Sequence, residues 1–156
     1  MHADIAETGP REDTLVYGAL PDIGYRDGFE VHYPSVTFAN VDDYARRYFL
    51  AQPPWLSLLS MHLGSREKIA RALDDGGLRL GTSVGGWTIH LRDESEIVFG
   101  QDMGFMEYRF GMRWVDPAST FVSTVCQFKG RTGAAYFAVV KHFHRPFVRY
   151  SLGLVQ

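Results

Sequence analysis

Between residues 87 and 128 apolar and polar side chains alternate with a period of two, and this alternation constrains the fold more than any other feature of the sequence. It predicts half-buried strands at 87–92, 96–101, 106–114 and 120–128, separated by the turn signals DES, QDMG and DPAS. These connections are too short for parallel crossovers. We therefore expect an antiparallel meander with one dry face, on which Trp87, Ile89 and Leu91 share a side.

The segments on either side complete an α+β pattern. DGFEVHYP alternates as a further strand that ends at Pro34. ANVDDYARRYFLAQ has helical spacing with Asn40 as N-cap and Asp43 three residues on, and helical pieces in PPWLSLLSMHLG and REKIARALDDGG extend a helical block to about residue 75. GRTG then introduces a long helix over roughly 133–152. We expect that helix to cover the sheet in an α+β architecture.

The chain has the length of a single domain, at 156 residues. Residues 1–14 combine Gly, Pro and acidic residues, which predicts a flexible tail before one domain over 15–156. Its 22 aromatic residues (11 Phe, 8 Tyr and 3 Trp) exceed what a small core needs. This surplus indicates a lined cavity, a partner surface or both.

Composition also excludes several classes of function. A net charge of -2 gives no basic stripe for nucleic acid, and a single cysteine, Cys126, cannot form an internal disulfide. No apolar run reaches the roughly 20 residues that span a membrane, and the acidic start is unlike a signal peptide. We expect a cytoplasmic protein that binds neither nucleic acid nor membrane. The sequence does not determine the oligomeric state, and a weak dimer is compatible with it.

The long helix carries an apolar side and a basic side. At about 100° per residue, one side holds Tyr136, Phe137, Val140, Phe143, His144, Phe147 and Ser151. His142, Arg145 and Arg149 lie on the other. His144 is therefore either a core histidine bonded to a tyrosine or carbonyl, or a ligand-contacting one. Pro146 lacks the N–H that a helix interior needs, and a kink is expected there.

Two motifs resemble a catalytic site and a metal site, but the sequence around them does not support either function. GTSVG, residues 81–85, matches a nucleophile elbow, but a strand follows it where the motif requires a helix. His142 and His144 are two residues apart, so on a helix they point to nearly opposite sides and cannot share a metal. We predict no metal site and no cofactor.

The strongest candidate for a ligand-binding surface is the apolar face of residues 106–114. Two methionines there add adaptable surface to aromatic walls, which suits a flat apolar ligand, although the same face would also serve as plain packing. With the helix opposite, the predicted ligand-binding residues are Met106, Tyr108, Phe110, Met112, Trp114, Phe137, Val140, His144 and Phe147.

A family resemblance rests on YRDGFEV, on PPW and on GRTGAAYFAVVKHFHRPFVRYSL. With these segments, residues 15–152 resemble the bacterial family known as domain of unknown function 2867. The layout is similar to the START-like, helix-grip superfamily, which implies a curved antiparallel sheet wrapped around a long C-terminal helix with a hydrophobic pocket between them. His144 and Arg145 match the family's F-H-R element and Tyr136 its A-Y element. The resemblance transfers no catalytic residue.

From these features we expect the protein to bind a small hydrophobic molecule between sheet and helix. One alternative is a cyclase or dehydratase in which His144 is the general acid/base and Tyr108 or Tyr136 orients an oxygen. Another is an interaction module with a filled core and an exposed Trp55. We further expect no Asp or Glu opposite His144, and therefore a neutral imidazole at pH 7.

Overall fold

The computed structural model describes residues 2–53, 55, 66–75 and 77–156. Most of the predicted helix in PPWLSLLSMHLG lies outside the described residues. The elements in chain order are β1 (Asp4–Glu7), η1 (Leu15–Gly18), β2 (Tyr25–Arg26), β3 (Phe29–His32), α1 (Val41–Ala51), α3 (Arg66–Asp75), β4 (Ser83–Val84), β5 (Trp87–Arg92), β6 (Glu96–Asp102), β7 (Met106–Asp116), β8 (Ser119–Phe128) and α4 (Gly130–Gly153).

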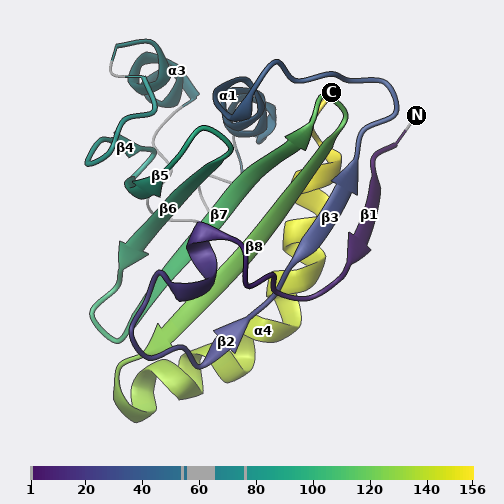
Figure 1. Ribbon diagram of the computed structural model, residues 1–156. Coiled ribbons are helices and arrows are strands. Elements are labelled where there is room, and N and C mark those ends of the chain that lie inside the picture. The colour runs from purple at the N-terminus through teal and green to yellow at the C-terminus, as the bar shows by residue number, and fades with distance from the viewer. Residues whose placement is uncertain (1, 54, 56–65, 76) are drawn as a thin grey trace.

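The described strands form one antiparallel sheet. Its order is β1-β3-β8-β7-β6-β5-β4, and β2 also pairs with β8, continuing the line of β3 (Figure 1). Strands β5 to β8 follow one another through tight turns, and β7 and β8 are the longest. The predicted antiparallel meander is confirmed.

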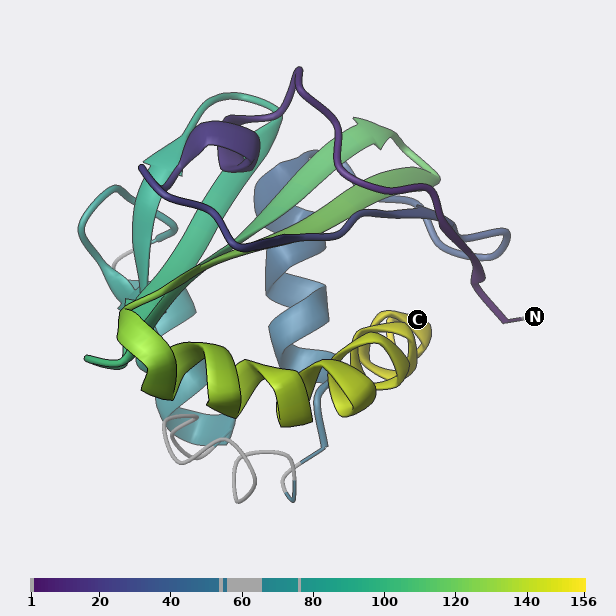
Figure 2. The same ribbon diagram turned by 90° about the horizontal axis from the view of Figure 1, so that it is seen from below.

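The curved sheet has different covers on its two faces. Helices α1 and α4 lie on the concave face, and the N-terminal segment with η1 crosses the other (Figure 2). On that outer face the buried Glu96 carboxylate accepts the backbone N–H groups of Leu15 and Val16 at 2.8 and 3.1 Å. These bonds fix η1 on the sheet. The result is an α+β fold with its helices gathered on one face.

Helix α1 begins as its sequence predicts. The Asn40 side chain accepts the N–H of Asp43 at 2.9 Å as the N-cap, and the Asp43 carboxylate accepts the N–H of Ala39, the residue before the cap, at 3.1 Å. The helix buries Tyr44 and Phe49 in the main core. It therefore fills the space beneath one half of the sheet.

Two predictions along the sheet differ from the structure. Residues Asp4–Glu7, expected in a flexible tail, form the edge strand β1, because their backbone pairs with β3 and Ile5 packs against the core. Leu91, expected beside Ile89, is instead exposed. A β-bulge between Ile89 and Leu91 shifts the register by one position and turns Leu91 to the opposite face.

Helix α4 starts at Gly130, three residues before its predicted start, and continues through Pro146 to Gly153. Its green turns lie across the view in Figure 2, whereas its yellow C-terminal turns are seen nearly end-on. The helix therefore bends in its C-terminal part, as the missing N–H of Pro146 predicts. The bend lets one helix follow the curve of the sheet.

Candidate functional site

A cavity of about 260 Å³ lies between the sheet and α4. Its floor is the concave face of β5 to β8, its roof is α4, and Tyr48 of α1 closes one side. Its lining is largely apolar and aromatic: Tyr48, Trp87, Gln101, Met103, Met106, Tyr108, Phe110, Val122, Thr124, Cys126, Tyr136, Phe137, Val140, His144, Phe147 and Val148. The cavity exists where α4 covers the sheet without α1 beneath it.

Seven of the nine predicted ligand-binding residues line this cavity. Met106, Tyr108 and Phe110 point inward from β7, and Phe137, Val140, His144 and Phe147 face them from α4. The period-two alternation of the strand and the 100° spacing of the helix together predict that these residues face one another. Phe110 also stacks on Phe99 with 5.1 Å between ring centroids, which holds its ring against the floor.

Met112 and Trp114 share the inward face of β7 but do not line the cavity. Met112 is fully buried in the main core, and the Trp114 indole N–H donates to the carbonyl of Phe38 at 3.2 Å. Helix α1 and the segment before it occupy the space above this end of β7. The prediction that Met112 and Trp114 line the ligand site is therefore wrong, because the strand pattern cannot show where a second helix covers the sheet.

His144 contacts a buried carboxylate at the roof of the cavity. Its Nε2 lies 2.8 Å from Oδ2 of Asp27, a residue that is only 2% exposed. The expectation that no Asp or Glu faces His144 is therefore wrong. With Nε2 occupied, Nδ1 of His144 has no hydrogen-bond partner among the described residues.

Asp27 is held by donors on three sides. Its Oδ1 accepts the backbone N–H of Thr124 at 2.7 Å, and its Oδ2 accepts the hydroxyl of Tyr25 at 3.0 Å as well as the His144 contact. A carboxylate surrounded in this way acts as an acceptor, so it places a hydrogen of the imidazole on Nε2. Burial raises the pKa of Tyr25 to about 12, which keeps its hydroxyl a donor.

A second polar group lies toward the β5–β6 side of the cavity. The indole N–H of Trp87 donates to the hydroxyl of Tyr108, and that hydroxyl donates to Oε1 of Gln101 at 3.3 Å. Burial raises the pKa of Tyr108 to about 12. Because indole can only donate, this chain has one direction and leaves the Gln101 amide nitrogen without a partner among the described residues.

Sequence reasoning missed Asp27 and Tyr25, although the signal was present. In YRDGFEVHY the alternation that buries Phe29 and Val31 extends backwards to Asp27 and Tyr25 on the same face. The register agrees, since Tyr25 pairs with Cys126, which lines the cavity. A charged residue on the apolar face of a strand calls for a partner, and His144 is that partner.

The other chemical motifs gain no support as sites. Ser83 of GTSVG lies in the short strand β4, and among the described residues its hydroxyl contacts that of Thr88 at 3.2 Å and no histidine or carboxylate. Gly81 and Gly85 have positive φ, as expected for a tight glycine loop. Within the described ranges no three His, Cys, Asp or Glu side chains gather to hold a metal ion.

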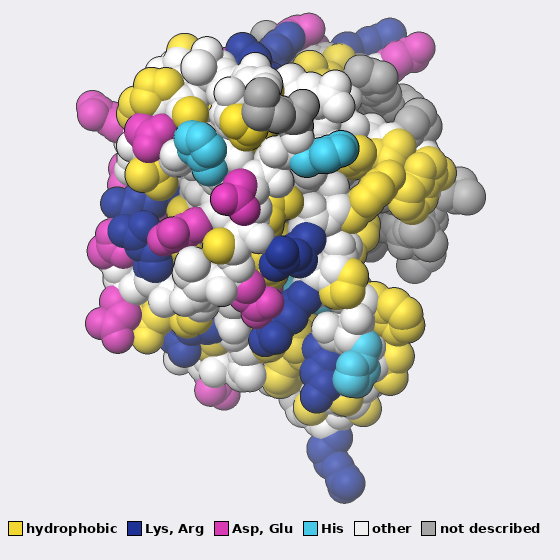
Figure 3. Space-filling model, turned by 90° about the vertical axis from the view of Figure 1, so that its right-hand side faces the viewer, with side chains coloured by type: hydrophobic (Ala, Val, Ile, Leu, Met, Phe, Trp, Pro, Cys, Tyr) yellow, Lys and Arg dark blue, Asp and Glu magenta, His cyan; other side chains and the backbone are white. Residues whose placement is uncertain are grey.

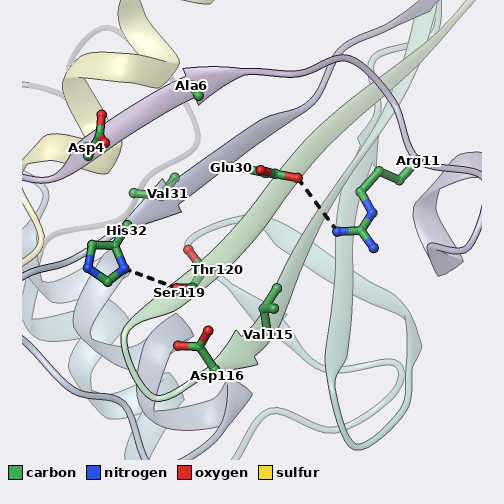
Figure 4. A pocket seen from close by; sticks show the side chains of 10 residues that line it. All are labelled: Asp4, Ala6, Arg11, Glu30, Val31, His32, Val115, Asp116, Ser119 and Thr120. Atoms are coloured by element: carbon green, nitrogen blue, oxygen red, sulfur yellow. Dashed lines mark hydrogen bonds and ion pairs between the residues drawn. The ribbon is translucent and has the colours of Figure 1, made fainter.

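A separate hollow lies on the outer face over β1, β3 and β8 (Figure 4). There His32 Nδ1 lies 3.2 Å from the Ser119 hydroxyl, and Arg11 forms an ion pair with Glu30 at 3.9 Å. Its lining mixes both signs of charge around exposed strand residues. It lacks the apolar walls of the cavity under α4.

Part of α4 presents hydrophobic side chains to solvent. Val139 is 63% and Phe143 71% exposed, and hydrophobic side chains reach the surface on the α4 side of the molecule (Figure 3). Trp55 is also 51% exposed, with its ring 6.0 Å from that of Tyr150. Exposed Trp55 fits an interaction module, whereas the cavity departs from the filled core that this alternative requires. In the part of the chain described, no helix has both the length and the apolarity to cross a bilayer.

Comparison with known proteins gives a family and little else. The family model described as "Protein of unknown function (DUF2867)" matches residues 19–151. The chain belongs to the DUF2867 family. The matched segment includes Tyr25, Asp27 and His144, so the whole Asp27–His144 contact lies inside the DUF2867 region. A search of curated proteins and a search of solved structures found no match.

Proposed function

We propose that the protein binds a small apolar or aromatic molecule in the cavity between the sheet and α4. The observation that carries this proposal is the cavity itself, with apolar walls on both sides and a few polar groups at fixed places. This combination is typical of ligand sites. Its volume of about 260 Å³ is just below the roughly 300–1,000 Å³ of common ligand pockets, so the ligand is small.

The proposal includes a helix-grip arrangement of the START-like kind. In that arrangement a curved antiparallel sheet holds a long C-terminal helix, and the ligand lies between them. The curved sheet, the position of α4 on its concave side and the bend near Pro146 support it. We also infer a cytoplasmic location, which the single buried Cys126 favours.

Two variants on α4 test the binding proposal. Val140→Phe adds a ring to the cavity wall, whereas Ala138→Phe adds one to an exposed position of the same helix. Small molecules that co-purify with the parent protein are identified by mass spectrometry and titrated back. We expect the ligand to be absent from Val140→Phe and present in Ala138→Phe. Equal retention by both variants would place the ligand elsewhere.

The Asp27–His144 contact favours a second function, general acid/base catalysis on the bound molecule. Asp27 holds the imidazole in one tautomer and would stabilise the imidazolium that forms when Nδ1 takes a proton. A fitting reaction class is proton abstraction from carbon next to a carbonyl. The proton moves to Nδ1, and the electron pair moves to the carbonyl oxygen as an enolate.

Hydrogen–deuterium exchange tests this second function directly. The methyl protons of 2,6-diacetylnaphthalene, whose two acetyl groups can reach both ends of the cavity, are followed by NMR in D₂O with the parent protein and with Asp27→Asn. Catalysis predicts exchange that saturates with ketone concentration and falls at least 100-fold in the variant. Exchange at the rate of buffer alone with the parent would rule out this reaction.

A further inference from the structure

Among the polar side chains that line the cavity, two are oriented by hydrogen bonds at opposite ends of it, and together they describe the ligand. One is the Nδ1 of His144, which Asp27 orients from behind. The other is the amide nitrogen of Gln101, which the Trp87–Tyr108 chain leaves without a partner in the described part of the protein. Between them the floor is mainly apolar, with Met106, Phe110, Val122 and Cys126 beside Thr124. A ligand that fits this lining is polar at two ends and apolar in the middle.

The sheet register gives the separation of the two groups. Gln101 pairs with Tyr108, Tyr108 with Cys126 and Cys126 with Tyr25, so these four residues form one row across the inner face. Neighbouring strands are about 4.8 Å apart, which makes the row roughly 14 Å long between backbones. Gln101 and His144 lie toward its two ends, which leaves on the order of 10–14 Å between their polar groups. Less a hydrogen bond of about 3 Å at each end, the polar atoms of the ligand are roughly 4–8 Å apart, which is the length of a one- or two-ring system.

The two groups differ in hydrogen-bonding character. The Gln101 amide nitrogen can only donate, so it suits a carbonyl oxygen. With its Nε2 hydrogen directed at Asp27, the imidazole of His144 accepts at Nδ1 when it is neutral, so it suits a hydroxyl. A phenol fits His144 in either protonation state, because a phenol donates to the imidazole and a phenolate accepts from the imidazolium. Burial raises the pKa of Cys126 to about 12, which leaves an uncharged thiol beneath the middle of the ligand.

We propose that the ligand is an elongated, flat aromatic hydroxy-ketone whose hydroxyl binds His144 and whose carbonyl binds Gln101. This inference rests on the proposed binding function and adds the chemistry and orientation of the molecule. The stacked rings of Phe99 and Phe110 at the floor favour a flat body over a branched one.

Four probes with a common two-ring body test it by calorimetric titration. They are naphthalene, 2-naphthol, 2-acetylnaphthalene and 6-hydroxy-2-acetylnaphthalene. Each neutral hydrogen bond contributes about 0.5–1.5 kcal/mol, which corresponds to roughly two- to twelvefold in affinity. We expect each single group to tighten binding by that factor and the hydroxy-ketone to show both gains together.

Two variants test which residue binds which polar group of the ligand. Gln101→Leu should remove the gain from the acetyl group and keep the gain from the hydroxyl, and His144→Leu should do the reverse. Both variants should still bind naphthalene within about threefold of the parent, which shows that the cavity has kept its shape.

The outcomes separate this inference from the function on which it rests. If the parent binds all four probes equally, the cavity takes apolar molecules without the proposed polar ends, and the inference is wrong. The same holds if both gains survive in both variants. If no probe binds, the inference and the proposed binding function are both overturned.

Discussion

Asp27→Asn should reverse the hydrogen-bonding character of His144 with only a moderate loss of stability. The asparagine Oδ1 can still accept the N–H of Thr124, which lies 2.7 Å from the native oxygen. Its amide nitrogen, however, donates where the carboxylate accepted. His144 must then accept at Nε2 and carry its hydrogen on Nδ1, the atom without a partner among the described residues.

The cost can be worked from the three bonds that Asp27 accepts. The bond from Tyr25 is lost, which costs about 1 kcal/mol, and the other two lose their charge assistance, about 0.5 kcal/mol each. We therefore expect the free energy of unfolding to fall by about 2 kcal/mol. Asp27→Ala leaves the buried N–H of Thr124 and the half-buried donors of Tyr25 and His144 without their acceptor, and should cost about 3–5 kcal/mol.

Urea unfolding and imidazole NMR measure the two effects. The ¹⁵N shifts of His144 should show hydrogen on Nε2 in the parent and on Nδ1 in Asp27→Asn, and binding of 2-naphthol should weaken in the variant. Asp22→Asn, at an exposed position without a hydrogen-bond partner among the described residues, should change stability by less than about 0.5 kcal/mol. An Asp27→Asn protein as stable as the parent, with an unchanged tautomer, would refute the reasoning.

Three further predictions concern other parts of the fold. Burial raises the pKa of Glu96, so the protonated side chain stabilises the fold below the unfolded pKa, and this contribution is lost as pH rises through the folded pKa. In urea unfolding from pH 4 to 7, Glu96→Gln should therefore gain stability relative to the parent as pH rises, and a relative loss would contradict this. The pKa of Cys126 near 12 predicts that a thiol reagent at pH 8 labels native protein far more slowly than urea-unfolded protein, and equal rates would show an exposed thiol. A Cβ at Gly133 would lie 2.1 Å from the carbonyl oxygen of Phe105, so Gly133→Ala should lower the free energy of unfolding by about 1–3 kcal/mol, whereas Ala135→Ser on the exposed side should not.

The parts of the fold that local pattern determines could be predicted from sequence. The meander, the Asn40 cap of α1 and the inward face of β7 each follow from a period or a cap that a short segment carries. The position of α1 over Met112 could not be predicted in this way, because it depends on how distant segments pack. The bulge at Leu91 is likewise invisible to a period count, since it adds one residue to an otherwise regular strand.

The candidate site likewise has a part that local pattern predicts and a part that depends on how distant segments pack. Helical angle placed His144 on the apolar side of α4, and the structure has it there. Its partner Asp27 lies 117 residues earlier in the chain, and only strand pairing with β8 brings the two together. Following the alternation of Phe29 back to Asp27 would have shown a buried carboxylate in need of a donor, although not which donor it meets.

Methyl NMR with 2-naphthol as the added ligand tests the central claim most directly. Val140 lines the cavity, and its neighbour Val139 is 63% exposed on the other side of α4. Binding in the cavity predicts saturable shifts of the Val140, Val122 and Met106 methyl signals, with contacts from these methyl groups to the naphthol protons and little change at Val139. Shifts confined to Val139, or no saturable shift at any of these methyl groups, would contradict a ligand site between the sheet and α4.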